Sequence, residues 1–163
     1  MRKTNLTVKR LHEVASYDPD TGMWTWLVRL NSRTKVGESR YGSPHSQGYW
    51  TLCIDGESYL THRLAWLYMT GEWPPEEIDH ENRDRSDCRW SNLRLADSAG
   101  NKQNKLKPNK HGFPGVKPAG DRWRSRIFID GKEQCLGRFD TPEQASAAYL
   151  AAKAKHHPFF SQP

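Results

Sequence analysis

Apolar and polar residues alternate in short runs along much of the chain, and this pattern predicts several short strands. Residues 23–29 alternate as a half-buried strand does. Residues 48–55 and 58–61 do the same, and the Asp55-Gly56 pair between them favours a tight turn. We therefore predict a hairpin in this part of the chain.

A helix is predicted directly after the hairpin. From Thr61 onward, apolar residues recur at helical spacing. Gly71 supplies a stop signal, and Pro74-Pro75 prevents the helix from continuing. The hairpin and this helix lie in the first part of the chain, residues 1–76, here called the leader.

The middle of the chain contains an unusually polar stretch, EEIDHENRDRSDCRWSNLRL, which spans residues 76–95. The expected elements, in order, are a short strand at 76–79, an irregular loop, a second short strand at 93–96 and a short helix ending near Asn104. Asp97 or Ser98 would cap that helix, since both residue types accept hydrogen bonds from the free N–H groups of a helix start. The Asp79-His80 pair lies at the end of the first of these strands.

The last part of the chain begins after a basic linker, residues 105–112, which has no apolar period. Three strands are expected next, at 113–119, 121–130 and 131–140, with a final helix at 141–157. Thr141 and Pro142 form a strong helix start, because Thr caps and Pro fits the first turn. Short antiparallel sheets combined with separate helices predict an α+β fold.

Alternation within 121–130 separates two kinds of side chain. Arg122, Arg124 and Arg126 share one face, and Trp123 with the isoleucines shares the other. A sheet with three arginines on one face and a helix covering its back has the surface needed to enter a DNA groove.

Composition limits the class of protein. Only 35% of the 163 residues are hydrophobic, but seven Trp, six Tyr and five Phe can each bury a large area, so the chain is not of disordered composition. No apolar run approaches the ~20 residues that span a bilayer, and the N-terminal stretch lacks the apolar region of a signal peptide. Three widely separated cysteines argue against a disulfide framework. We expect a cytoplasmic protein without a membrane partner.

Charge is distributed unevenly. The net charge of +6 divides into +2 for residues 1–60, -3 for residues 61–100 and +7 for residues 101–163. A cationic module most often binds a polyanion. The Asp79-His80 pair therefore lies in a locally acidic stretch that precedes a basic one.

Residues 78–104 carry the spacing D-H, eleven residues, N, eight residues, N. This spacing resembles the ββα-metal motif of the HNH endonucleases, most closely the phage-type homing and nicking group. The leader, with GYW-L-IDG-YL-HRLAW, resembles the segment that often precedes the motif in phage HNH proteins. Residues 113–152, with RWRSRI and LGRFDTPEQASAAY, resemble the AP2 DNA-binding domain.

The resemblance implies four modules: the leader at 1–76, a nuclease motif at 77–104, a linker at 105–112 and an AP2-like domain at 113–157. It departs from the AP2 pattern at Glu133 and Cys135, so a DNA target cannot be inferred from it.

The residues fit phosphodiester hydrolysis. His80 can accept a proton from water at neutral pH. Asp79 and Asn101 offer a carboxylate and an amide oxygen, which suit a single Mg²⁺ or Mn²⁺ ion. Asn92 is assigned to the catalytic set, either as a participant or as the organiser of the loop. His62 is expected to pack within its helix, and Asn104 is either part of the site or a surface residue.

These features together predict a metal-dependent endonuclease that cuts double-stranded DNA at a recognised site, of the homing type. A monomer is expected, and with one active site it would nick one strand. The residues expected to contact DNA are all basic: Lys102, Lys105, Lys107, Lys110, Lys117, Arg122, Arg124 and Arg126. The alternatives are a non-catalytic AP2-type regulator with a degenerate HNH fold and, more remotely, an RNA-binding protein.

Overall fold

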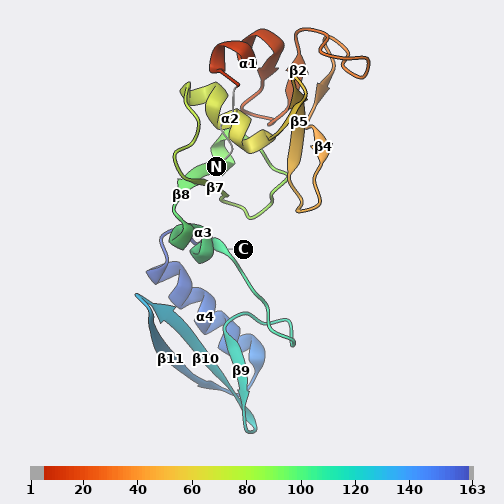
Figure 1. The fold of residues 1–163 in the computed structure, drawn as a ribbon. Helices are drawn as coiled ribbons and strands as arrows, with labels where there is room; N and C mark the ends of the chain where they lie inside the picture. The colour runs from red at the N-terminus through yellow and green to blue at the C-terminus, as the bar shows by residue number, and fades with distance from the viewer. Residues whose placement is uncertain (1–5, 162–163) are drawn as a thin grey trace. The chain divides into compact units, whose positions relative to one another are not determined.

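The computed structural model describes residues 6–161. The chain forms two compact units, Met1–Ala96 and Asp97–Pro163, and each is described by itself (Figure 1). Both combine helices with small antiparallel sheets, as an α+β fold does.

The first unit contains three small sheets, with strand orders β1-β2-β3, β4-β5-β6 and β7-β8. Its elements are α1 (Val8–Val14), β1 (Ala15–Tyr17), β2 (Trp24–Trp26), β3 (Ser39–Arg40), β4 (Ser43–Pro44), β5 (Trp50–Ile54), β6 (Glu57–Leu60), α2 (Thr61–Thr70), β7 (Glu77–His80), the 3-10 turn η1 (Trp90–Asn92) and β8 (Leu93–Ala96).

The predicted hairpin is present as β5 and β6, and the helix that follows it is α2. Asp55 and Gly56 have φ values of 51° and 86°, the pair of positive angles that a tight hairpin turn requires. Gly71 ends α2 in the left-handed conformation at φ 83°, and its N–H bonds to the carbonyl of Leu67.

Two parts of the leader differ from the prediction. The strand predicted at 23–29 is wrong in length, since β2 covers only Trp24–Trp26 and bends follow it. The helix α1 was not predicted, because seven residues give too few turns for an apolar period to show. It is capped by Thr7, whose hydroxyl accepts a hydrogen bond from the N–H of Arg10 at 3.2 Å.

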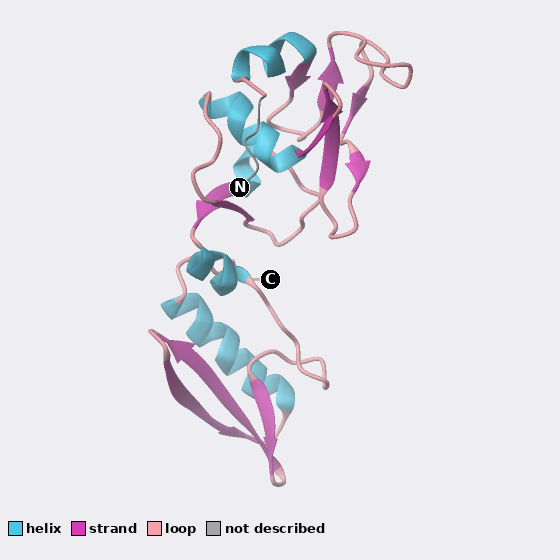
Figure 2. Ribbon diagram, in the orientation of Figure 1, coloured by secondary structure: helices cyan, strands magenta, loops and turns pink. Residues whose placement is uncertain are grey.

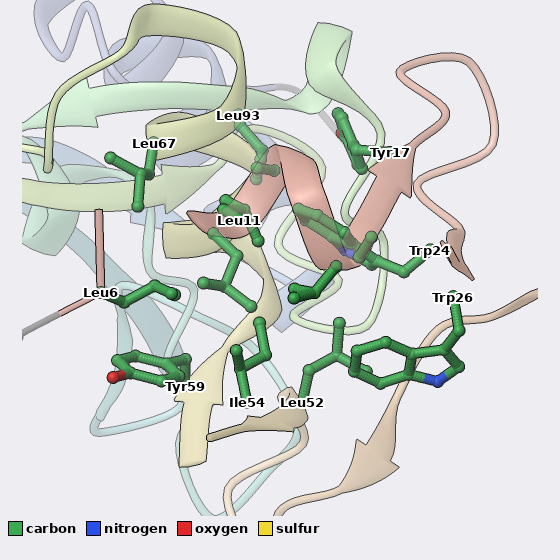
Figure 3. Packing of buried hydrophobic residues seen from close by; sticks show 14 of the residues in the cluster. Leu6, Leu11, Tyr17, Trp24, Trp26, Leu52, Ile54, Tyr59, Leu67 and Leu93 are labelled. Atoms are coloured by element: carbon green, nitrogen blue, oxygen red, sulfur yellow. The ribbon is translucent and has the colours of Figure 1, made fainter. Parts of the chain in front are cut away.

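A hydrophobic core in the first unit joins these short elements. Figure 3 shows side chains of the cluster, among them Leu11 from α1, Trp24 from β2, and Leu52 and Ile54 from β5. Ile78 and Leu93 belong to the same cluster. Strand β7, which carries Asp79 and His80, and its partner β8 are thus anchored to the core by these apolar residues.

The second unit is a three-stranded antiparallel sheet packed against one long helix (Figure 2). Its elements are α3 (Ser98–Asn104), β9 (Val116–Ala119), β10 (Arg122–Ile129), β11 (Lys132–Phe139) and α4 (Pro142–His156), with strand order β11-β10-β9. Thr141 caps α4 as predicted, since its hydroxyl accepts a hydrogen bond from the N–H of Gln144.

The short helix α3 is held within the second unit by the C-terminal segment. A Cβ at Gly100 would lie 2.8 Å from the ring of Phe159, so only glycine allows this close approach. Asn104 is 1% exposed and its Oδ1 accepts a hydrogen bond from the N–H of Ser161. Asn104 is therefore a buried anchor and not a surface residue.

Within residues 6–161, no helix combines the length and the apolar character needed to cross a membrane. The three cysteines all carry free thiols.

Candidate active site

Strand β7 places Asp79 and His80 at the edge of the core. It pairs with β8 so that Asp79 lies opposite Arg94 and His80 lies opposite Leu93. Both side chains are largely buried, at 6% and 4% exposed. Buried polar groups need partners, so the neighbours of these two residues determine what they can do.

Asp79 is held by Arg94 from the neighbouring strand. Its Oδ2 accepts two hydrogen bonds from the guanidinium, one from Nη2 at 2.9 Å and one from Nε at 3.1 Å. A charge-assisted pair in a partly buried site fixes the carboxylate in one orientation and offsets its charge. The carboxylate predicted as a metal ligand is therefore oriented by the fold.

His80 lies among rings and carboxylates. The ring of His62 is 5.0 Å away and that of Tyr49 is 5.8 Å away, between centroids. Burial lowers the pKa of His80, and this effect outweighs the opposing influence of Asp79, Asp84 and Asp87. The imidazole is consequently uncharged at neutral pH, which is the form that accepts a proton.

Asn92 organises the loop between the two strands. Its Oδ1 accepts a hydrogen bond from the N–H of Asn82 at 2.9 Å, and its Nδ2 donates to the carbonyl of Asp87 at 2.8 Å. Its own carbonyl accepts from the N–H of Glu81. These bonds connect both halves of the loop to one buried amide.

Cys88 anchors the same loop to the rest of the first unit. Its sulfur lies 3.2 Å from the hydroxyl of Thr61 at the start of α2, and its carbonyl accepts a hydrogen bond from the hydroxyl of Tyr17 at 2.6 Å. Burial raises the pKa of the Cys88 thiol to about 11. A buried, protonated thiol is a packing group and not a nucleophile.

His62 was expected only to pack in its helix, but the structure also places it beside His80. It is 5% exposed, and burial lowers its pKa to about 3, with smaller contributions from His80 and Arg63. Sequence spacing did not indicate the contact, because the two residues lie 18 positions apart on α2 and β7.

Asn101 lies on α3, which Asp97 caps by accepting a hydrogen bond from the N–H of Gly100 at 2.6 Å. It is half-buried. Residues 6–161 contain no group of three or more His, Cys, Asp or Glu side chains that could hold a metal ion. A carboxylate and an amide are each oxygen donors of the kind that Mg²⁺ accepts beside its water ligands.

The basic residues expected to contact DNA differ in their environments. Lys102, Lys105, Lys107, Lys110 and Lys117 are exposed. Arg122 is paired with Asp140 and Arg126 with Glu133. Arg124 lies directly opposite Lys117 on β9 and Arg138 on β11. Arg138 was not predicted, because its position depends on strand register.

Three cations therefore form a row across the sheet: Lys117, Arg124 and Arg138, here called the cationic row. Within residues 6–161 none of the three forms an ion pair. Like charges directly opposite one another in a sheet are destabilising unless an anion offsets them.

Comparison with known proteins gives one match. Residues 59–103 match the family model described as HNH endonuclease. No curated protein and no solved structure matches the chain. The matched segment begins in β6 and includes α2, β7, the loop, β8 and nearly all of α3. The part of the chain that carries His62, Asp79, His80, Asn92 and Asn101 is thus similar to the HNH endonucleases, a family of nucleases.

Proposed function

We propose that the chain is a divalent-metal-dependent endonuclease that hydrolyses phosphodiester bonds of double-stranded DNA at a recognised site. One observation carries the proposal. The segment similar to HNH endonucleases presents a buried imidazole, uncharged at neutral pH, beside a carboxylate that Arg94 fixes in place.

His80 serves as the general base. Its imidazole accepts a proton from the attacking water while the new P–O bond forms and the bond to the leaving 3′ oxygen breaks. Burial keeps His80 uncharged, so the base form is present at neutral pH. Asn92 contributes by holding the loop that follows His80.

Asp79 and Asn101 are the proposed protein ligands of a single Mg²⁺ or Mn²⁺ ion. Carboxylate and amide oxygens are hard donors that suit such ions. When bound, the ion supplies positive charge for the phosphate in the transition state. Arg94 orients the carboxylate of Asp79 in advance, which lowers the cost of organising the site.

The second unit is proposed to bind the DNA. Its cationic row and the linker lysines lack acidic partners within the described residues, so phosphates can take that place. The exposed pair Arg122–Asp140 contributes little to stability, and Arg122 can exchange its carboxylate for a phosphate. We assign contacts to Lys102, Lys105, Lys107, Lys110, Lys117, Arg122, Arg124 and Arg126, and add Arg138.

The proposed modules are the leader at 1–76, the nuclease motif at 77–104, the linker at 105–112 and an AP2-like binding domain at 113–157. A homing-type enzyme that acts as a monomer would nick one strand, since the chain holds one proposed centre. Cutting both strands would need a second chain or a second event.

The test is a plasmid-nicking assay with the purified chain. Supercoiled DNA should be converted to the nicked form with Mg²⁺ or Mn²⁺ and should stay intact with excess EDTA. His80→Ala should lower the rate by about 10²–10⁴-fold while DNA affinity stays unchanged, because the imidazole acts on water and not on DNA.

The matched control is His12→Ala. His12 is a histidine of the first unit that stacks on Tyr68 at 4.0 Å, far in sequence from the proposed centre, so its loss should leave nicking unchanged. DNA binding without any metal-dependent cleavage would instead support the non-catalytic regulator.

A further inference from the structure

Three rings from separate parts of the first unit, one of them that of His80, meet at the candidate site. Tyr49 precedes β5, His62 is the second residue of α2, and His80 ends β7. The ring centroids of His62 and His80 are 5.0 Å apart at an interplanar angle of 77°. Tyr49 lies 4.9 Å from His62 and 5.8 Å from His80. The imidazole of His80 therefore has one ring contact on α2 and another next to β5.

A residue of the loop that follows His80 also contacts this cluster, at Tyr49. The guanidinium of Arg85 lies 5.0 Å from the ring centroid of Tyr49, and its Nη1 donates a hydrogen bond to the carbonyl of Gln47 at 2.9 Å. A cation over an aromatic face is attracted to it. Arg85 thus links the loop to the Tyr49 ring of this cluster.

Packing alone does not explain a histidine at position 62. Its Nδ1 is buried and makes no hydrogen bond within residues 6–161. A buried polar atom in this condition costs free energy, whereas a phenylalanine ring would occupy similar space without that cost. Nor does His62 provide a cation for phosphate, because burial lowers its pKa to about 3.

A general base is sensitive to its orientation. Its nitrogen must come within hydrogen-bond reach of the water, and a misplaced group loses much of its effect. Edge-to-face contact between rings fixes their relative angle, because the positive edge of one ring is attracted to the face of the other. An imidazole edge is more polarised than a phenyl edge, so it holds a neighbouring ring more firmly.

We propose that His62 is a positioning residue of the nuclease centre, and that its imidazole holds the ring of His80 in the orientation that accepts a proton from water. This inference rests on the proposed function. His62 acts through His80 and touches neither water nor DNA in this role.

The test compares His62→Leu and His62→Phe with the control His12→Phe, each assayed for kcat, KM and thermal unfolding. His62→Leu removes the ring, and kcat should fall by up to about 10²-fold. KM for DNA should stay within about twofold, since uniform binding is not affected. His62→Phe keeps a ring without nitrogens and should show a smaller loss of kcat, with an unfolding temperature no lower than that of the wild type. His12→Phe should retain wild-type kcat.

A double-substitution experiment separates positioning from an independent role. In a His80→Ala background, His62→Leu should lower the residual rate by less than about twofold, because the group that it positions is gone. The same loss in both backgrounds would overturn the inference, as would wild-type kcat in folded His62→Leu. If His62→Leu fails to fold, His62→Phe carries the test, and wild-type kcat in that variant would overturn the inference.

The two proposals fail in different ways. A wild-type chain that cleaves no DNA with Mg²⁺ or Mn²⁺ overturns the proposed function, and the role of His62 with it. A wild-type chain that cleaves DNA, with His62 variants that cleave equally well, overturns the role of His62 alone.

Discussion

Arg94 donates two hydrogen bonds to one oxygen of Asp79, from Nη2 at 2.9 Å and from Nε at 3.1 Å, across the pair of strands β7 and β8. Removing the guanidinium would leave a largely buried carboxylate without this partner. Arg94→Ala should therefore lower the free energy of unfolding by about 1.5–3 kcal/mol, the usual value of hydrogen bonds to a charged group. Urea unfolding of the purified variant measures this.

The control for Arg94 is Arg10→Ala. Arg10 also donates two hydrogen bonds to one carboxylate, that of Asp55, but both side chains are exposed. Solvent screens such a pair, so Arg10→Ala should lower the free energy of unfolding by clearly less than Arg94→Ala does. Equal losses in the two variants would show that burial of the Asp79–Arg94 pair has no energetic consequence.

Metal dependence tests the proposed ligands. Asp79→Asn and Asn101→Ala should each move half-maximal nicking to a higher Mg²⁺ or Mn²⁺ concentration, because the first replaces a charged carboxylate donor by a neutral amide and the second removes an amide oxygen. Asp55→Asn, which changes a carboxylate far in sequence from the centre, should titrate as the wild type does. If the Asp79 and Asn101 variants also titrate as the wild type, the ion is held by other residues.

The loop that follows His80 should depend on Asn92. Asn92→Ala removes a hydrogen bond to the N–H of Asn82 and another to the carbonyl of Asp87. Hydrogen exchange should become faster across residues 81–92, and the nicking rate should fall because the loop presents the centre.

Asn31→Ala is a suitable control for Asn92. The Asn31 side chain also accepts a hydrogen bond from a loop N–H, that of Arg33 at 2.9 Å, but it belongs to an exposed loop of the leader. Unchanged exchange in residues 81–92 of Asn92→Ala would contradict the organising role.

Thiol reactivity reports on the anchor of the same loop. Cys88 is 1% exposed, and burial raises its pKa to about 11, so at pH 8 it is protonated and shielded. Iodoacetamide should modify Cys53 and Cys135, which are exposed, and leave Cys88 unmodified in the folded chain. Mass spectrometry of the digested protein reads out each site. Modification of Cys88 at the rate of the other two would show that the loop opens readily.

Turn and cap residues in the sequence correctly predicted the ends of several hairpins and helices. Asp55-Gly56 and Asp130-Gly131 take positive φ angles and close their hairpins, because those residue types tolerate that conformation. Thr141 and Pro142 start α4 in the same local way. The short strands β3 and β4 lack such signals, since two residues cannot display an alternation.

The contacts that Asp79 and His80 make with other residues could not be predicted from the nearby sequence. The Asp79–Arg94 pair depends on the register of β7 and β8, and the His62–His80 contact depends on how α2 packs. Neither is encoded in spacing along the chain. The same limit explains why Arg138 was missed, although the arginines of β10 were predicted to share a face.

DNA binding by the second unit is best tested with single substitutions. A chain that stops near Lys107 would remove the partners of α3, including Phe159 and the Lys153 side chain that donates to the carbonyl of Lys105 at 2.6 Å. Such a truncation would disturb the helix that carries Asn101 together with the sheet. Loss of cleavage in it would therefore not separate binding from chemistry.

The cationic row offers a sharper test, because Lys117, Arg124 and Arg138 lie side by side on three strands and form no ion pair within the described residues. If they contact phosphates, each substitution by alanine should lower the slope of log affinity against log salt by about 0.9 on duplex DNA. Lys155→Ala, on the exposed part of α4, changes the charge equally and should keep the full slope.

Arg124 is the member of the row that can separate the two kinds of contact, since it lies on the central strand β10. If its guanidinium reaches a base edge, Arg124→Ala should cost about 1–3 kcal/mol on the preferred site and relax the preference at one position. If it contacts only phosphate, affinity should fall equally for all sequences. Fluorescence anisotropy over a range of salt concentrations, with a randomised duplex as reference, distinguishes the two. Unchanged affinity and slope in all three variants would mean that this face of the sheet does not hold the DNA.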